Sequence, residues 1–202
     1  MPKSPQSHLD ARKPLVVDTT KLPRQPGATR ALKRVVPAPA DLGLELISVP
    51  EGSDLELDLS MTSVSEGVYV SGTVRGSLSG ECGRCLNEID STFEVSLAEM
   101  FAYEDSTTEE TTDEDEVGRM QGDLLDLEPA VRDAVVLTLP TNPVCRPDCP
   151  GLCPECGVHL DDLPADHSHE EVDARWAALR NLTNAELSET APPQDPQKNT
   201  EE

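Results

Sequence analysis

Cysteine spacing is the feature of this sequence that points most directly to chemistry. The segment CRPDCPGLCPECG, residues 145–157, holds four cysteines, and the motif CGRC holds two more upstream. Zinc binds four nitrogen or sulfur ligands in a tetrahedron, and a Cys-x-x-Cys turn supplies two thiolates at once. The spacing therefore predicts structural zinc. The candidate cysteine ligands are Cys82, Cys85, Cys145, Cys149, Cys153 and Cys156.

The ligand count brings two histidines into the prediction. Six cysteines are too many for one tetrahedral site and two short of two sites. His167 and His169 follow the last cysteine closely and would complete a second site, although these two residues could also be solvated surface residues. His159 is a reserve ligand. The favoured grouping is Cys82, Cys85, Cys145 and Cys149 in one site, and Cys153, Cys156, His167 and His169 in the other. The alternative is a single local site formed by the last four cysteines, with the CGRC pair free.

Two other uses of clustered cysteines compete with structural zinc. Six cysteines in a secreted chain could form disulfides, but the N-terminus shows no apolar run of signal-peptide length and no stretch approaches a membrane span. We expect a cytoplasmic protein, whose thiols are kept reduced. A thioredoxin-like redox motif would start a helix within a βαβ pattern, which the sequence does not show. Gly83 and Gly157 offer positive φ angles at the two turns at little cost.

We expect no enzymatic activity and no small-molecule substrate. A catalytic zinc keeps an open coordination position beside a carboxylate base. The acidic residues near the cysteines, Asp161, Asp162 and Glu170, are typical of a charged surface, and neither HExxH nor a deaminase signature is present.

The elements that would position the cysteines are mostly strands. Leu55, Leu57, Leu59 and Met61 alternate with polar residues, a period of two that predicts a half-buried strand. The segments before and after CGRC alternate similarly, so they predict a hairpin with two thiols at its tip. Only five residues are aromatic, so the core rests on Val, Leu and Ile, and a metal would help to stabilise it.

We predict an α+β fold, mainly an antiparallel sheet with one or two helices, a cysteine-rich zinc-knuckle lobe and disordered termini. The segment DLLDLEPAVRDAVVLTLP predicts a helix that ends before Pro140; Pro129 would lie in its first turn if it begins near Leu127. The predicted bounds are a disordered basic tail at 1–13, a single domain at 14–182 and a disordered tail at 183–202; within the domain, a sheet region at 42–103, an acidic loop at 104–122, a helix at 124–139, the cysteine-rich lobe at 145–169 and a short helix at 171–182.

Charge is distributed unevenly along the chain. The formal net charge is −23, yet residues 1–34 contain eight Lys or Arg against two Asp, which leaves −29 on the remainder. A basic arm can contact phosphates while an acidic body repels them, although such an arm can also be a plain solvated tail. The candidate RNA contacts are Arg12, Lys13, Lys21, Arg24, Arg30, Lys33 and Arg34.

The sequence resembles the YceD family, the large ribosomal RNA subunit accumulation proteins. The resemblance runs from about Pro14 to Leu182 and rests on VSGTVRGSLSGECGRCL, LPTNPVCRPDCPGLCPECGVHL and DARWAALRNL. Many members carry Cys-x-Cys where this chain has His167-Ser-His169, and imidazole can replace thiolate on zinc. The replacement equally allows loss of the second site.

The resemblance implies a bacterial or plastid protein that supports synthesis, processing or stability of 23S rRNA, with no established catalytic activity. Expected partners are precursor 23S rRNA or large-subunit assembly intermediates, contacted directly or through a basic ribosomal protein docked on the acidic body. The rival hypotheses are a zinc- or thiol-dependent redox-sensing regulator and a zinc ribbon associated with RNA polymerase.

Overall fold

A sheet, one helix and two cysteine-rich turns make up the part of the chain that the computed structural model describes, residues 9–106 and 117–169. It forms two compact units, the first ending at Leu152 and the second beginning at Cys153. The division falls inside the predicted lobe 145–169, where we expected one domain. The elements are β1 (Val16–Asp18), β2 (Thr29–Pro37), β3 (Ile47–Ser48), β4 (Asp54–Val64), β5 (Gly67–Glu81), β6 (Glu88–Ala102), β7 (Gly118–Arg119), β8 (Leu124–Asp126), α1 (Glu128–Thr138) and the 3-10 turn η2 (Leu160–Asp162).

The main sheet of the first unit has the order β2-β4-β5-β6-β7, and β3 also pairs with β5. Its long strands are antiparallel, while the two residues of β7 run parallel to β6. β1 and β8 form a separate antiparallel pair. With α1 as the one α-helix among the described residues, the predicted α+β class is confirmed.

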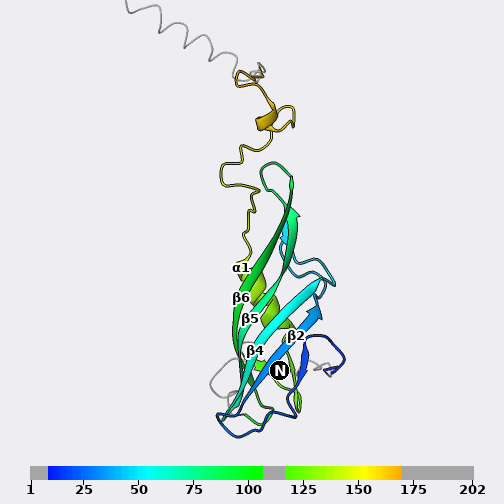
Figure 1. Cartoon of the computed structure of the whole chain (residues 1–202), viewed down its shortest axis with the longest axis vertical. Helices are drawn as coiled ribbons and strands as arrows, with labels where there is room; N and C mark the ends of the chain where they lie inside the picture. Colours follow the sequence, from blue (N-terminus) through cyan, green and yellow to red (C-terminus); the bar gives the residue numbers. More distant parts are fainter. Residues whose placement is uncertain (1–8, 107–116, 170–202) are drawn as a thin grey trace, which may run out of the picture. The chain divides into compact units, whose positions relative to one another are not determined.

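The core lies between one face of the sheet and α1 (Figure 1). In β4 the burial alternates strictly, with Leu55, Leu57, Leu59 and Met61 buried, as the sequence alternation predicts. Pro129 lies in the first turn of α1, where its missing N–H costs no hydrogen bond. The helix buries Val131 and Val135 against the sheet, which leaves the opposite sheet face without a helix among the described residues.

The β5–β6 hairpin positions the first cysteine pair. β5 pairs with β4 only as far as Arg75, but with β6 along its whole length to Glu81. The hairpin therefore continues past the end of β4 (Figure 1). The residues between Glu81 and Glu88 form its tip, which contains the CGRC motif.

Several predicted boundaries differ from the structure. The sheet begins at Thr29 rather than 42, because β2 pairs with β4 throughout its length. The helix begins at Glu128 rather than 124, because residues 124–126 pair with β1 instead. The predicted acidic loop contains β7 and the buried Met120.

The N-terminal segment is also more ordered than predicted where it is described. Residues 9–13 form a turn, in which the N–H of Lys13 donates to the carbonyl of Asp10 at 3.0 Å. The N–H of Leu9 donates to Oε1 of Gln121 at 2.7 Å. The predicted helix at 171–182 and tail at 183–202 lie outside the described residues, as do residues 1–8 and 107–116. No helix in the described parts has the length and apolar character needed to cross a membrane.

Candidate metal centres

The first group of candidate ligands lies at the tip of the β5–β6 hairpin. Cys82 and Cys85 come from the tip, and Cys145 and Cys149 come from the segment after α1. The sulfur atoms of Cys82 and Cys149 are 3.8 Å apart, and those of Cys85 and Cys145 are 3.6 Å apart. Sulfur atoms bound at about 2.3 Å to a tetrahedral ion lie about 3.8 Å from one another. This group could therefore hold a metal ion with little rearrangement.

Apolar packing holds together the two arms of this first site, which are the hairpin tip and the segment after α1. Cys82, Cys85 and Cys149 are buried in a small apolar cluster, which Ile89, Val144 and Leu152 complete. Cys145 is exposed. Three of the four candidate ligands are therefore shielded from bulk solvent.

Arg84 connects the hairpin tip to the second arm. Its guanidinium Nη1 donates to the carbonyl of Cys149 at 2.9 Å, and its own carbonyl accepts from the N–H of Leu152 at 3.2 Å. The N–H of Gly83 also donates to the carbonyl of Pro143 at 2.8 Å. These hydrogen bonds join the two arms of the first site through the protein's own groups.

The second group lies entirely within the second unit. Cys153 Sγ is 3.4 Å from Nε2 of His169, and Cys156 Sγ is 3.7 Å from Nε2 of His167. A tetrahedral ion with sulfur at about 2.3 Å and nitrogen at about 2.05 Å places such atoms about 3.6 Å apart. The two imidazole rings are nearly perpendicular, at 86°, with centroids 4.5 Å apart. The four ligand atoms lie within 4.8 Å of one another, so this group could also hold a metal ion.

The two Cys-x-x-Cys turns share one backbone pattern. In the first, the N–H of Leu86 donates to the carbonyl of Cys82 at 2.9 Å; in the second, the N–H of Gly157 donates to the carbonyl of Cys153 at 2.8 Å. Both residues have positive φ, 61° at Leu86 and 69° at Gly157. The same hydrogen-bonded knuckle is therefore built twice, once with a leucine where glycine would be relaxed.

The expectation for Gly83 needs correction. It has no positive φ; the residue of the first knuckle that does is Leu86. A Cβ at position 83 would lie 2.1 Å from Oδ1 of the exposed Asn142, so a larger residue there would displace the Asn142 side chain. The spacing of the cysteines does not reveal this contact between Gly83 and the second arm.

Thiol acidity differs within each group. Hydrogen bonding from the N–H of Cys145, with smaller contributions from the N–H groups of Arg84 and Cys85, lowers the pKa of Cys82 to about 6. Desolvation and the neighbouring sulfurs raise the pKa of Cys145 to about 12. In the second group, the N–H groups of Cys156 and Glu155 lower the pKa of Cys153 to about 6. A bound cation would stabilise the thiolate form of the cysteines in each group.

The structure thus brings the eight predicted ligands together in the grouping that the sequence analysis favoured. The two groups have no ligand in common, and His159 belongs to neither group. Each set has four protein ligands, which leaves no open position on a tetrahedral ion.

A family model described as "Large ribosomal RNA subunit accumulation protein YceD" matches residues 70–183, more than half of the chain. The chain belongs to the YceD family. The matched range runs from within β5 through all eight candidate ligands, so both knuckles lie in the part of the chain that the YceD model describes.

Curated relatives extend the likeness over most of the chain. The uncharacterized protein Rv2926c of Mycobacterium tuberculosis is 50% identical over 182 residues, which are 90% of this chain and 87% of the relative. The uncharacterized protein ML1660 of Mycobacterium leprae is 44% identical over 186 residues, 92% of this chain and 84% of the relative. The uncharacterized protein YlbN of Bacillus subtilis is 26% identical over 111 residues, 54% of this chain and 63% of the relative. No solved structure matches the chain.

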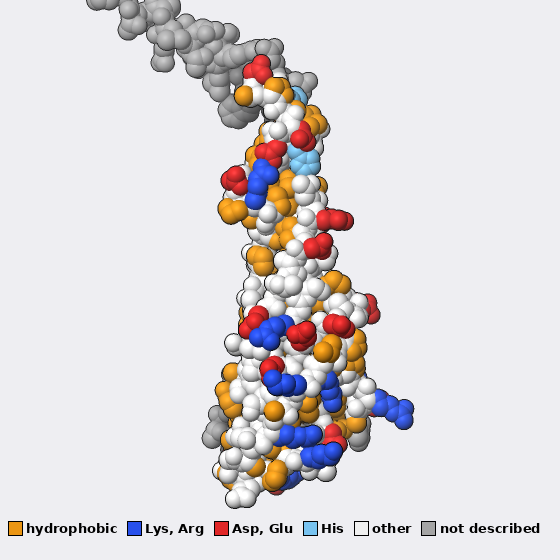
Figure 2. Space-filling model, viewed as in Figure 1, with side chains coloured by type: hydrophobic (Ala, Val, Ile, Leu, Met, Phe, Trp, Pro, Cys, Tyr) orange, Lys and Arg blue, Asp and Glu red, His pale blue; other side chains and the backbone are white. Residues whose placement is uncertain are grey.

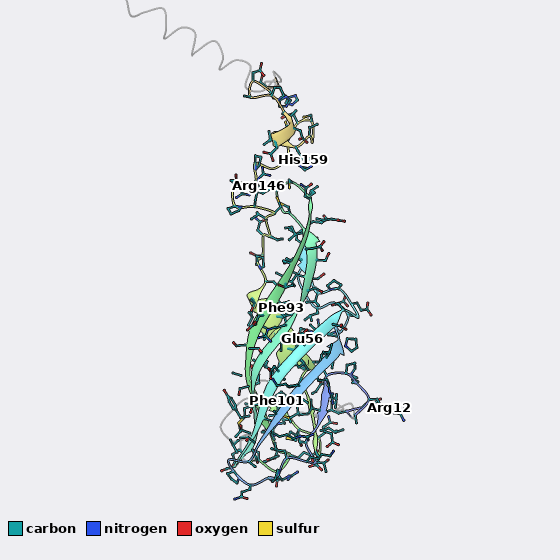
Figure 3. All side chains as sticks on the ribbon, viewed as in Figure 1. Arg12, Glu56, Phe93, Phe101, Arg146 and His159 are labelled. Atoms are coloured by element: carbon teal, nitrogen blue, oxygen red, sulfur yellow. The ribbon has the colours of Figure 1, made fainter. Side chains whose placement is uncertain are left out.

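The seven basic candidates of this YceD protein do not form one surface. Arg12 and Lys13 lie in the turn before β1, and Figure 3 shows Arg12 pointing away from the sheet. Lys33 lies on the open face of β2 and pairs with Asp58 at 2.9 Å. Arg24 lies over the ring of Tyr103, with its guanidinium carbon 4.7 Å from the centroid.

The remaining three basic candidates converge. Lys21, Arg30 and Arg34 line one hollow beside β2. On the sheet face that Figure 2 shows, Lys and Arg side chains lie among Asp and Glu side chains. Sequence reasoning named these residues for their charge but had no signal that would separate them from Lys33. That separation depends on the strand register, since Arg30 and Arg34 share the inner face of β2 with the buried Val36.

Sequence reasoning also missed Arg84 as a residue of the metal centre. The only available signal was its place inside a Cys-x-x-Cys turn, where an arginine is equally compatible with a free surface side chain. The hydrogen bond to the carbonyl of Cys149 depends on the meeting of two segments far apart in sequence.

Proposed function

We propose that this protein is a non-enzymatic, cytoplasmic factor that supports accumulation of 23S rRNA during assembly of the large ribosomal subunit. The observation that carries the proposal is the family match over residues 70–183, whose description names large ribosomal RNA subunit accumulation. The matched range includes both knuckles.

Zinc is the metal that we assign to both groups. A set of four thiolates, or of two thiolates and two imidazoles, suits a tetrahedral d¹⁰ ion. The ligand distances of 3.8 Å and 3.6 Å in the first group agree with this geometry. Zinc bound there would stabilise the hairpin tip and its connection to the segment after α1.

The partners that we propose are precursor 23S rRNA and the assembly intermediates that contain it. The strongly acidic remainder of the chain supports contact with a basic ribosomal protein, because opposite charges attract and phosphates would be repelled. The basic residues Lys21, Arg30 and Arg34, which lie together at the edge of the sheet, support a smaller, local contact with RNA phosphates. Closed metal sites support a structural rather than a catalytic role.

Depletion of the protein in its own host tests this proposal. We expect the ratio of 23S to 16S rRNA to fall, and we expect the tagged protein to co-sediment with precursor large-subunit particles in a salt-sensitive manner. Complementation with Cys145→Ser should fail if the metal centre is needed, while wild type should restore the ratio. An unchanged ratio together with no co-sedimentation would refute the proposal.

A redox-sensing role remains the second candidate, because one observation favours it. The pKa values near 6 for Cys82 and Cys153 favour the thiolate form of both side chains at neutral pH when no metal is bound. A sensor should keep reactive thiols in its metal-loaded form and should release metal on oxidation. Mass-spectrometric thiol labelling of the loaded protein distinguishes the two roles, since a structural site should be protected from the label.

A further inference from the structure

A basic hollow lies at the edge of the main sheet in the first unit. It has a volume of about 290 Å³ and lies between the inner face of β2 and the segment that follows β1. Its apolar floor is formed by the half-buried Leu32 together with the buried Val17 and Met61. Its polar rim is formed by Asp18, Thr20, Lys21, Arg30 and Arg34.

The strand register explains why the positive charges meet there. Arg30 and Arg34 are opposite Met61 and Leu57 of β4, so their side chains lie on the core side of the sheet. Because β2 is the edge strand, this side remains open to solvent at its margin. Lys21 reaches the same hollow from the loop after β1. Three cations therefore surround a space with a single carboxylate, that of Asp18.

Asp18 offsets only one of these three positive charges. Its carboxylate accepts hydrogen bonds from the N–H and the hydroxyl of Thr20, which lower the pKa of Asp18; the charges of Arg30 and Lys21 lower it further. Within residues 9–106 and 117–169, no ion pair or side-chain hydrogen bond involves Lys21 or Arg30. Lys33 and Arg75, on the open sheet face, are paired with carboxylates instead. The hollow thus has uncompensated positive charge.

We propose that this hollow binds one nucleotide of single-stranded RNA, with its phosphate held by Lys21 and Arg30 and its base or sugar against the apolar floor. This site rests on the proposed role in rRNA accumulation and gives that role a defined contact. Arginine suits the phosphate because its planar fork offers two parallel donors to the phosphate oxygens. The volume is near the lower end of the range for small-ligand sites, which fits one nucleotide and excludes a duplex.

The charge of the molecule restricts where RNA can bind. The chain carries −23 overall, so a long phosphate backbone lying across the acidic regions would be repelled. A short single strand that enters the hollow from the sheet edge meets the basic residues first. This is why we expect a local, salt-sensitive contact rather than a broad RNA-binding face.

The test measures the affinity of the full chain for a fluorescein-labelled 12-nucleotide oligouridine by fluorescence anisotropy at 50, 100 and 200 mM KCl. The site variant is the double substitution Lys21→Gln/Arg30→Gln. The matched control is Lys33→Gln/Arg75→Gln, which removes the same charge from the open face of the same sheet. Far-UV circular dichroism and metal content verify that each variant is folded, and Lys21→Arg/Arg30→Lys should restore binding.

We expect the site variant to weaken binding about tenfold or more at 100 mM KCl, because charge-assisted hydrogen bonds to a phosphate are lost. The slope of log affinity against log salt should fall by about 0.7, the contribution of one phosphate on a single strand. The affinity of the control variant should stay within about twofold of wild type, because salt screens the effect of two positive charges that lie outside the hollow. Uridine 5′-monophosphate in excess should displace the oligouridine.

Equal loss in the site variant and the control would overturn the proposal, as would wild-type protein that does not bind oligouridine at 50 mM KCl. The same variants are also assayed for co-sedimentation with precursor large-subunit particles. If wild type and the site variant co-sediment equally and oligouridine affinity is unchanged, the hollow is refuted while the biogenesis role stands. If co-sedimentation alone is lost, the hollow docks a protein and the RNA assignment is refuted. If wild type neither co-sediments nor affects 23S rRNA, the role itself fails.

Discussion

Loss of the metal from the first site should destabilise the sheet far more than loss from the second. The matched perturbations are Cys145→Ser and Cys156→Ser. Each replaces an exposed cysteine, so neither leaves a cavity in the core. Each also removes one ligand from a set of four, and we expect each variant to lose its ion. The two variants therefore compare the same chemical change at two places in the chain.

The expected magnitude follows from the loop that each ion closes. The first site joins residues 60 apart in sequence, Cys85 and Cys145, and a cross-link closing such a loop stabilises the native state by about 4 kcal/mol. The second site joins residues only 11 apart, Cys156 and His167, and all its ligands lie in the second unit. Its loss should leave the free energy of unfolding of the first unit nearly unchanged.

Urea unfolding in reducing buffer, followed by far-UV circular dichroism, measures this difference because the long strands belong to the first unit. With a slope of about 2 kcal/mol per molar urea, Cys145→Ser should lower the midpoint by about 2 M. Cys156→Ser should stay within a few tenths of wild type. Wild type treated with chelator should behave like Cys145→Ser. Equal midpoints for the two variants would refute the reasoning that the first ion joins distant segments of the sheet unit.

Two further predictions concern residues near the sites and the core. Leu86→Gly should leave metal affinity at the first site unchanged or higher, whereas Gly157→Ala should weaken metal affinity at the second site about fivefold. The reason is that a non-glycine residue at positive φ costs about 1 kcal/mol. Competition with a chromogenic chelator measures both affinities, and an equal loss in both variants would contradict the shared knuckle. Tyr103→Phe removes the buried hydrogen bond to Ser63, 3.0 Å between the hydroxyl oxygens, and should cost about 1 kcal/mol. Urea unfolding tests it, and an unchanged midpoint would show that the bond contributes nothing net.

Most of the strand content could be predicted from the sequence, because one face of the sheet is buried. Leu55, Leu57 and Leu59 must share a face, and the period of two is readable without any knowledge of the partner strands. The edge strand β2 was missed because its inner face is only partly buried and so is not uniformly apolar. Its inner face carries Arg30 and Arg34, which reach solvent at the margin of the sheet, so its alternation is not one of apolar and polar residues.

The candidate ligands could be predicted because metal chemistry restricts residue type and local spacing. Counting ligands favoured two sites, but the sequence left open a single site formed by the last four cysteines, and the structure favours the two-site grouping. The residues that organise the first site could not be found in this way. Arg84 acts through a carbonyl from a segment far along the chain, and Leu86 adopts a conformation for which leucine gives no signal. The start of α1 was placed too early because Leu124 and Leu125 suit a strand as well as a helix.

The central claim is that two structural ions are bound, one in each group. Native mass spectrometry of protein purified without chelator tests it most directly, with zinc identified by elemental analysis. The account predicts two zinc ions per chain in wild type, one in His167→Ala/His169→Ala, one in Cys145→Ser and none when these changes are combined. A wild-type protein without zinc, or a stoichiometry that the histidine substitutions leave unchanged, would contradict the account.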